Sequence, residues 1–144
     1  MKRKYPKNPL VGGGGVVIDR DRALLIRRGS EPLKGEWSIP GGMLELGEEL
    51  TAGVKRELKE ETGLEVEPRE CLLVFDRIMR EGGRVKYHYV IVDYLCRRKA
   101  GRLRPASDVI DARWVRRHDL PQYHLTDMAT TVILEAFERV KKRR

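Results

Sequence analysis

The sequence predicts a single α/β domain over residues 1–144, and three observations support this fold class. The length of 144 residues is close to the commonest size of one domain. Apolar residues make up 40% of the chain and are spread along it, which favours an ordered core over disorder. Short apolar runs typical of strands are interspersed with two segments of helical periodicity. The basic ends, 1–9 and 141–144, are expected to be flexible.

The first half of the chain predicts a strand hairpin followed by a loop and a helix. Two apolar runs, 11–18 and 23–28, are joined by the polar turn Asp19-Arg20-Asp21-Arg22. The four glycines at 12–15 lack both G-x-G-x-x-G spacing before a helix and G-K-[ST], so we interpret them as a close backbone approach beside a strand rather than a phosphate loop. After a loop-rich stretch, a helix is predicted from about Glu48 to Thr62, with Gly63 as its C′ residue.

The second half predicts three more strands and a final helix. Apolar segments near 71–79 and 85–96 are joined by Glu81-Gly82-Gly83, a hairpin signal, and a further strand is expected at 111–116. Thr126 can cap the last helix, whose apolar positions follow the 3.6-residue period. These positions, which we assign to the core, are Met128, Val132, Ile133, Ala136, Phe137 and Val140.

Composition favours a cytoplasmic protein. No apolar run approaches the roughly 20 residues that span a bilayer, and the basic start leads into Tyr, Pro and Asn instead of a signal-peptide apolar stretch. Cys71 and Cys96 each lie in a strand-like apolar run without metal-binding spacing, so we expect buried thiols in a reducing compartment.

The net charge of +8 is unevenly distributed. Residues 41–70 contain nine Glu and four Lys plus Arg, a net −5, which leaves +13 for the rest of the chain. Basic surface attracts polyanions such as nucleic acid or free nucleotides. The sequence contains no helix-turn-helix, zinc-binding or aromatic-platform pattern, so we do not expect nucleic acid as a partner.

The predicted helix at 48–62 departs from ordinary amphipathicity. Leu50, Val54 and Leu58 form an apolar stripe, but Glu57 and Glu61 project within the same arc, with Glu60 beside them. Carboxylates at this spacing repel one another and oppose the helix dipole, which indicates a compensating ligand. Clustered hard oxygen ligands suit Mg²⁺ or Mn²⁺, and these ions suit substrate phosphates.

These residues resemble the Nudix box, whose family pattern is G-x5-E-x7-R-E-U-x-E-E-x-G-U, with U an aliphatic residue. The chain matches it throughout, with Gly42, Glu48, Arg56, Glu57, Leu58, Glu60, Glu61, Gly63 and Leu64. The box covers 23 residues, and weaker likeness extends from about Val11 to Ala136. The resemblance implies the family's α/β/α sandwich around a mixed β-sheet, and a hydrolase that cleaves phosphoanhydride bonds of small nucleotides.

The resemblance also implies roles for single residues. Glu57, Glu60 and Glu61 should hold Mg²⁺ or Mn²⁺ with the Gly42 carbonyl, and Glu48 and Arg56 should orient them. Glu60 or Glu57 ranks first as the group that takes the proton of the attacking water. Asp108, six residues before Trp114, is the expected acidic metal ligand from outside the box, and Asp111 is the alternative.

Three segments outside the box look more like the ADP-ribose pyrophosphatase branch than the nucleoside triphosphate branch. They are Glu31-Pro32-x-Lys34-Gly35-x-Trp37, His88-Tyr89-Val90 and Leu120-Pro121-x-Tyr123. The implied reaction is ADP-ribose to AMP and ribose 5-phosphate; the alternatives are a MutT-like nucleoside triphosphate pyrophosphohydrolase and a nucleotide-sensing domain without turnover. Arg27 or Arg28 is expected to grip phosphate, and Trp37 or Tyr123 to stack on a base. A homodimer is compatible with the sequence.

Overall fold

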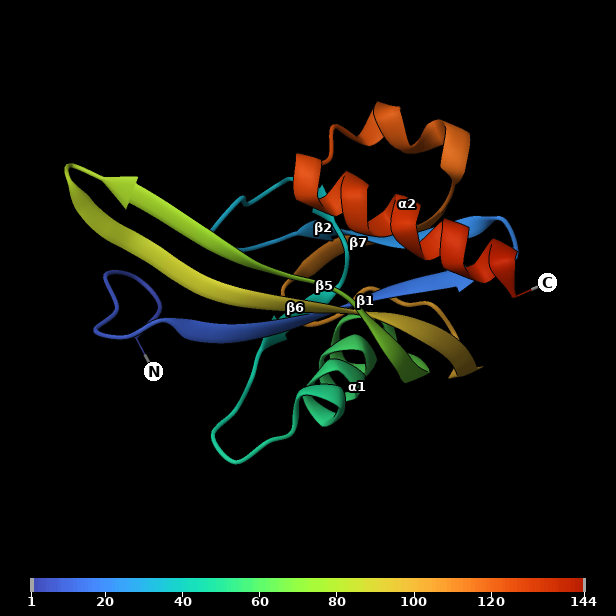
Figure 1. Cartoon of the computed structure of the whole chain (residues 1–144), viewed down its shortest axis with the longest axis horizontal. Helices are drawn as coiled ribbons and strands as arrows, with labels where there is room; N and C mark the ends of the chain where they lie inside the picture. The colour runs from blue at the N-terminus through green and yellow to red at the C-terminus, as the bar shows by residue number, and fades with distance from the viewer. Residues whose placement is uncertain (1, 144) are drawn as a thin grey trace.

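The computed structural model describes residues 2–143 as an α/β/α sandwich. Seven strands form one sheet in the order β3-β2-β1-β6-β5, with β4 beside β1 and β7 beside β2. Strands β1 and β6 run parallel and the other pairs antiparallel, so the sheet is mixed, as predicted. Helix α1 covers one face of the sheet and α2 the other (Figure 1). The elements are β1 (Leu10–Asp19), β2 (Arg22–Arg28), β3 (Trp37–Ser38), β4 (Gly41–Met43), α1 (Leu50–Thr62), β5 (Leu64–Glu81), β6 (Arg84–Gly101), β7 (Val109–Arg116), the 3₁₀ helix η1 (Arg117–Tyr123) and α2 (Asp127–Lys142).

The helix ends follow the local signals, with one shift. Helix α1 begins at Leu50 and not at Glu48, because Glu49 has extended backbone angles and makes no side-chain cap. Its predicted end is confirmed: Gly63 has φ 76°, a left-handed conformation that glycine adopts without strain, and donates its N–H to the Lys59 carbonyl. Helix α2 begins after Thr126, whose side chain accepts a hydrogen bond from the Ala129 N–H, as predicted.

The β5–β6 hairpin is longer than the sequence indicated. Both strands have 18 residues, and β5 starts directly after Gly63 instead of near Cys71. Register shifts near Glu65, Pro68 and Cys71 interrupt its alternation of apolar and polar residues, which hides the first half of the strand from pattern analysis. The turn end of the hairpin projects beyond both helices in Figure 1.

Alternation along the central strands divides the core into two layers. On β1, Val16 packs in the cluster with α2, and its neighbour Val17 packs in the cluster with α1. The glycines of β1 continue this alternation. A Cβ atom on Gly13 would lie 3.0 Å from Val54, and one on Gly15 would lie 2.8 Å from Leu58. The close backbone approach expected of these glycines is therefore the contact between β1 and α1.

One sequence expectation was wrong in part. Cys96 is buried and both cysteines are free thiols, but Cys71 is exposed, because the adjacent Leu72 takes the core position on β5. The flexibility expected of residues 1–9 stays a prediction, and Tyr5 in this segment contacts β6. The Tyr5 N–H donates to the Lys86 carbonyl at 2.7 Å, and its ring lies under the Arg84 guanidinium. Met1 and Arg144, at the two ends expected to be flexible, lie outside the described residues.

At the other end of the chain, helix α2 continues through Lys142, so the basic residues at 141 and 142 are helical. Among residues 2–143, no helix combines the length and apolar character needed to cross a membrane.

Candidate functional site

The carboxylates of α1 are organised around Arg56. Its Nε and Nη2 atoms donate to both oxygens of Glu48, at 2.7 and 2.9 Å. Its Nη1 donates to Glu57 at 2.9 Å and contacts Glu60 at 3.4 Å, and its Nη2 also donates to the Met43 carbonyl. The hydrogen bonds from Arg56 lower the pKa of Glu48 to about 2. Glu48 and Arg56 thus form a charged pair that fixes the carboxylate of Glu57.

Glu61 is the most buried member of the group. Only 7% of the residue is exposed, and its Oε1 accepts a hydrogen bond from the Gly41 N–H at 2.9 Å. Burial raises the pKa of Glu61 to about 8, against the effect of the Gly41 hydrogen bond, and repulsion from Glu57 acts in the same direction as burial. Burial also raises the pKa of Glu57, which Arg56 partly offsets. Both carboxylates would be stabilised in their charged forms by a cation.

Gly42 brings strand β4 into contact with α1. A Cβ atom on Gly42 would lie 2.3 to 2.6 Å from the carboxyl atoms of Glu57, closer than real Cβ contacts allow. The missing side chain therefore makes room for that carboxylate beside the β4 backbone. Gly42 and Glu57, which are 15 positions apart in the sequence, become neighbours for this reason.

Asp108, and not Asp111, faces this cluster. Asp108 lies in the loop before β7 and accepts a hydrogen bond from the Ser30 hydroxyl at 2.6 Å. Its negative charge adds a minor contribution to the pKa values of Glu57 and Glu61, which burial chiefly raises. The Asp111 carboxylate is instead held by Arg113 at 3.1 Å.

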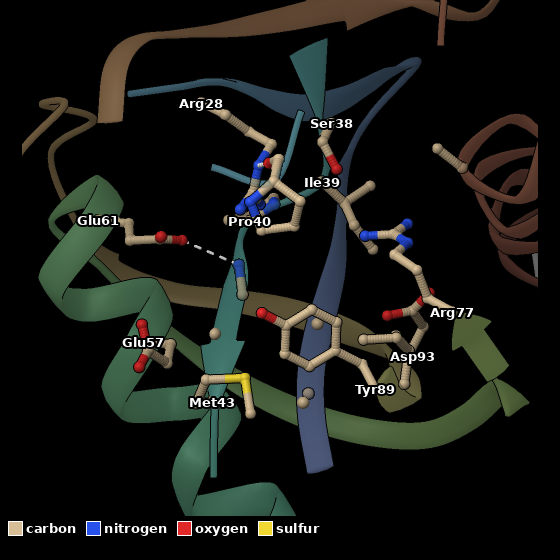
Figure 2. A pocket seen from close by; sticks show the side chains of 18 of the residues that line it. Arg28, Ser38, Ile39, Pro40, Met43, Glu57, Glu61, Arg77, Tyr89 and Asp93 are labelled. Carbon is tan, nitrogen blue, oxygen red and sulfur yellow. Dashed lines mark hydrogen bonds between the residues drawn. The ribbon is translucent and has the colours of Figure 1, made fainter. Parts of the chain in front are cut away.

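A cavity of about 280 Å³ opens beside this cluster. Glu57, Glu60, Glu61 and Asp108 line it together with the backbone of β4. The remaining lining includes the cations Arg3, Arg28 and Arg77, the aromatic rings of Phe75 and Tyr89, and the side chains of Ile91 and Asp93. In Figure 2, Glu57 and Glu61 lie on one side, Asp93 and Arg77 on the other, with Tyr89 between them.

Only one of the four predicted substrate contacts lies in this cavity. Arg28 lines it and donates from Nε to the Pro32 carbonyl, whereas Arg27, its neighbour on β2, points away and donates to the Gly35 carbonyl. Trp37 and Tyr123 do not line it. Their rings pack edge to face with centroids 5.1 Å apart and against the core cluster of α2. Aromatic pairs in this arrangement stabilise the fold through their contact and buried apolar area.

The sequence interpretation missed the Asp93 side of the cavity. Asp93 interrupts the otherwise apolar run 90–96 of β6, and a charge inside such a run is the signal that could have identified it. Arg77 gave no comparable signal, because it belongs to a strand that carries several charges.

The donor set fits a hard divalent cation. All side-chain donors of the cluster are carboxylate oxygens, the Gly42 backbone is adjacent to Glu57, and two of the carboxylates have pKa values raised by burial. Within residues 2–143, no three acidic, histidine or cysteine side chains already surround one point, since Arg56 engages Glu57 and Glu60.

Comparisons with known proteins point to one family. A NUDIX domain model matches residues 9–135. An ADP-ribose pyrophosphatase of Methanocaldococcus jannaschii is 30% identical over 80% of this chain and 66% of its own length. The crystal structure of a MutT NUDIX hydrolase from Burkholderia pseudomallei is 31% identical, with a TM-score of 0.78 over 90% of this chain and 98% of that one.

A third comparison includes a ligand. The NUDIX domain of Shewanella oneidensis NrtR, crystallised in complex with ADP ribose, is 25% identical, with a TM-score of 0.73 over 94% of this chain and 90% of that one. The chain spans 66% or less of the length of the first curated relatives that it matches.

The extent of the family match, with the complete box on α1, shows that this chain belongs to the NUDIX domain family. The resemblance seen in the sequence is thereby confirmed. Members of this family generally use divalent metal ions and act on small nucleotide substrates.

Proposed function

We propose that this chain is a hydrolase that cleaves the diphosphate linkage of ADP-ribose to give AMP and ribose 5-phosphate. The observation that carries the proposal is the cavity itself, in which four carboxylates face Arg28, Arg77 and two aromatic rings. Carboxylates suit a metal that binds a diphosphate, and cations with aromatic surfaces suit the rest of a nucleotide. Support for ADP-ribose comes from the name of the archaeal relative and from the ligand of the NrtR domain.

The proposed cofactor is Mg²⁺ or Mn²⁺, held by Glu57, Glu60 and Glu61 with the Gly42 carbonyl, and assisted by Asp108. When bound, such an ion supplies charge neutralisation to the diphosphate and acidity to a coordinated water. Arg56 and Glu48 act as positioning residues, since they hold Glu57 without lining the cavity.

The proposed reaction is the attack of a water molecule on one phosphorus of the diphosphate. Water oxygen bonds to phosphorus, the anhydride P–O bond breaks, and one phosphate leaves with the bridging oxygen. A carboxylate takes the water proton.

Glu60 ranks ahead of Glu57 here, because its side chain is 50% exposed against 17% for Glu57, and its contact with Arg56 is longer, 3.4 Å against 2.9 Å. We also propose a cytoplasmic location, since both cysteines are free thiols.

Glu60→Gln tests the assignment. The purified variant should cleave ADP-ribose at least 100-fold more slowly than the wild type at saturating Mg²⁺, because the lost charge weakens both metal binding and proton transfer. Its melting temperature without metal should be unchanged. Product AMP is measured by chromatography. Glu65→Gln, the same change on an exposed residue outside the cavity, is the control. Near-wild-type kcat in Glu60→Gln would contradict the role of Glu60.

A second candidate is a MutT-like nucleoside triphosphate pyrophosphohydrolase, favoured by the likeness to the Burkholderia enzyme. Competition at equal concentrations separates the two. A tenfold preference in kcat/KM, about 1.4 kcal/mol of transition-state binding, decides between ADP-ribose and a triphosphate. Absence of turnover of either, with retained nucleotide binding, would favour a sensing domain.

A further inference from the structure

Asp93 is a carboxylate almost enclosed by the protein at the edge of the cavity. The residue is 3% exposed, lines the cavity, and makes no hydrogen bond or ion pair with any residue between 2 and 143. The nearby charge that acts on it is the guanidinium of Arg77. Because the carboxylate borders the cavity, the donors that it lacks among the described residues must come from what fills the cavity, either water or a ligand.

The sheet register gives the position of Asp93 relative to the carboxylate cluster. Gly14 on β1 pairs with Asp93 on β6 and, on its other side, with Gly41 on β4. Two strand spacings of about 4.8 Å put the Asp93 backbone about 10 Å from that of Gly41. The Gly41 N–H binds Glu61, so this is also the approximate span from the cluster to Asp93. A nucleoside bridges such a span between its phosphate and the far edge of its base.

Gly14 leaves space for the Asp93 carboxylate beside the β1 backbone. A Cβ atom at this position would lie 2.4 Å from Oδ1 of Asp93 and 3.1 Å from Ile39. The absence of a side chain therefore lets the Asp93 carboxylate lie directly over the β1 backbone. Tyr89 and Ile91 precede Asp93 at alternate positions of β6, and Phe75 pairs with Ile91, so these side chains share one face of the sheet with Asp93. All three line the cavity and offer apolar contact to a base.

We propose that Asp93 determines base specificity by accepting a hydrogen bond from the exocyclic amino group of the substrate's nucleobase. This inference rests on the proposed function, in which the phosphates lie at the α1 carboxylates and the base is adenine. A charged carboxylate accepts hydrogen bonds and donates none, so it favours a base that presents an amino group over one that presents only acceptors there. Burial raises the pKa of Asp93 to about 7, and Arg77 on the adjacent β5 acts in the opposite direction. A hydrogen bond from the base amino group stabilises the charged form, so base recognition draws on that form at and above neutral pH.

Binding of two nucleotides that differ only in the amino group tests the proposal. The probes are AMP and purine riboside 5′-monophosphate, titrated calorimetrically into the protein in the same magnesium buffer. The wild type should bind AMP at least tenfold more tightly, because the deaminated base leaves the buried acceptor unpaired. In Asp93→Leu the two affinities should agree within twofold. Asp93→Asn, which keeps a carbonyl acceptor, should retain part of the preference.

Asp76→Asn is the matched control, because Asp76 lies on β5 with its side chain exposed and outside the cavity, and it should keep the wild-type ratio. Equal affinities in the wild type overturn the proposal, even if Asp93→Leu does not fold. An unchanged ratio of the two affinities in a folded Asp93→Leu also overturns the proposal, since loss of a purely structural role would weaken the binding of both nucleotides alike. Cleavage of ADP-ribose is assayed separately, so an Asp93-dependent preference without that cleavage refutes only the substrate assignment.

Discussion

Gly41 and Gly42 are adjacent on β4, but an added methyl group would meet rigid backbone at one and a movable side chain at the other. A Cβ on Gly41 would lie 2.4 Å from the Gly13 carbonyl oxygen, whereas one on Gly42 would strike the carboxyl group of Glu57. Gly41→Ala should therefore lower the free energy of unfolding by about 1–3 kcal/mol, as overpacking does. Gly42→Ala should change it by less than about 1 kcal/mol but reduce kcat at least tenfold, because Glu57 is displaced.

Urea unfolding and ADP-ribose turnover of the two variants measure these effects side by side. Full activity in Gly42→Ala would show that the position of Glu57 beside β4 does not matter for the reaction.

The buried carboxylate of Asp93 predicts a pH dependence of stability. Burial raises the pKa of Asp93 to about 7, from about 3.9 in an unfolded chain. Between these values the native state holds a proton that the unfolded state lacks, so the free energy of unfolding should fall as pH rises from about 4 to about 7. The full shift corresponds to about 4 kcal/mol at most.

Metal-free unfolding measured across this pH range should show a flatter profile for Asp93→Asn, which cannot titrate. Glu61 contributes a change of the same sign, so the difference between variant and wild type is the relevant quantity. Superimposable profiles of the two proteins would contradict the raised pKa.

At the scale of one element, α2 depends on its first turn. The Thr126 hydroxyl accepts from the Ala129 N–H at 3.2 Å and satisfies one of the free donors at the helix start. Thr126→Ala should cost about 1 kcal/mol of unfolding free energy, measured by urea denaturation, and should leave the KM for ADP-ribose unchanged because α1 and β4 hold the carboxylates. Thr126→Ser, which keeps the cap, should cost less, and equal losses in both would contradict a capping role.

The elements differ in how well the sequence predicted them, for identifiable reasons. Helix α1 and its carboxylates could be predicted, because helical periodicity and the box both depend on local spacing. The first half of β5 could not, because bulges break its alternation around Pro68. The Asp93 side of the cavity also escaped prediction, since it forms only when β6 lies beside β1 in parallel, a pairing between positions about 80 residues apart.

For the whole molecule, a cation that binds only the native state should raise its stability. Burial disfavours the charged forms of Glu57 and Glu61 in the metal-free protein, and a bound ion relieves this. The melting temperature should rise with Mg²⁺ or Mn²⁺, by the equivalent of about 2.7 kcal/mol at a concentration 100 times Kd. A Glu57→Gln, Glu61→Gln double variant should show little rise, with Glu65→Gln as the control. An undiminished rise in the double variant would place the ion elsewhere.

The glycines of β1 also have a mechanical consequence. Between α1 and the Asp93 side of the cavity, the partition is one polypeptide backbone thick, because Gly13 and Gly15 carry no side chains toward Val54 and Leu58, and Gly14 carries none toward Asp93. Close-packed interiors transmit displacement instead of absorbing it. Any movement of α1 against the sheet is therefore transmitted through the thin β1 layer to the surface on which the base would lie. The position of α1 on one face of β1 thus determines the width of the cavity on the other face.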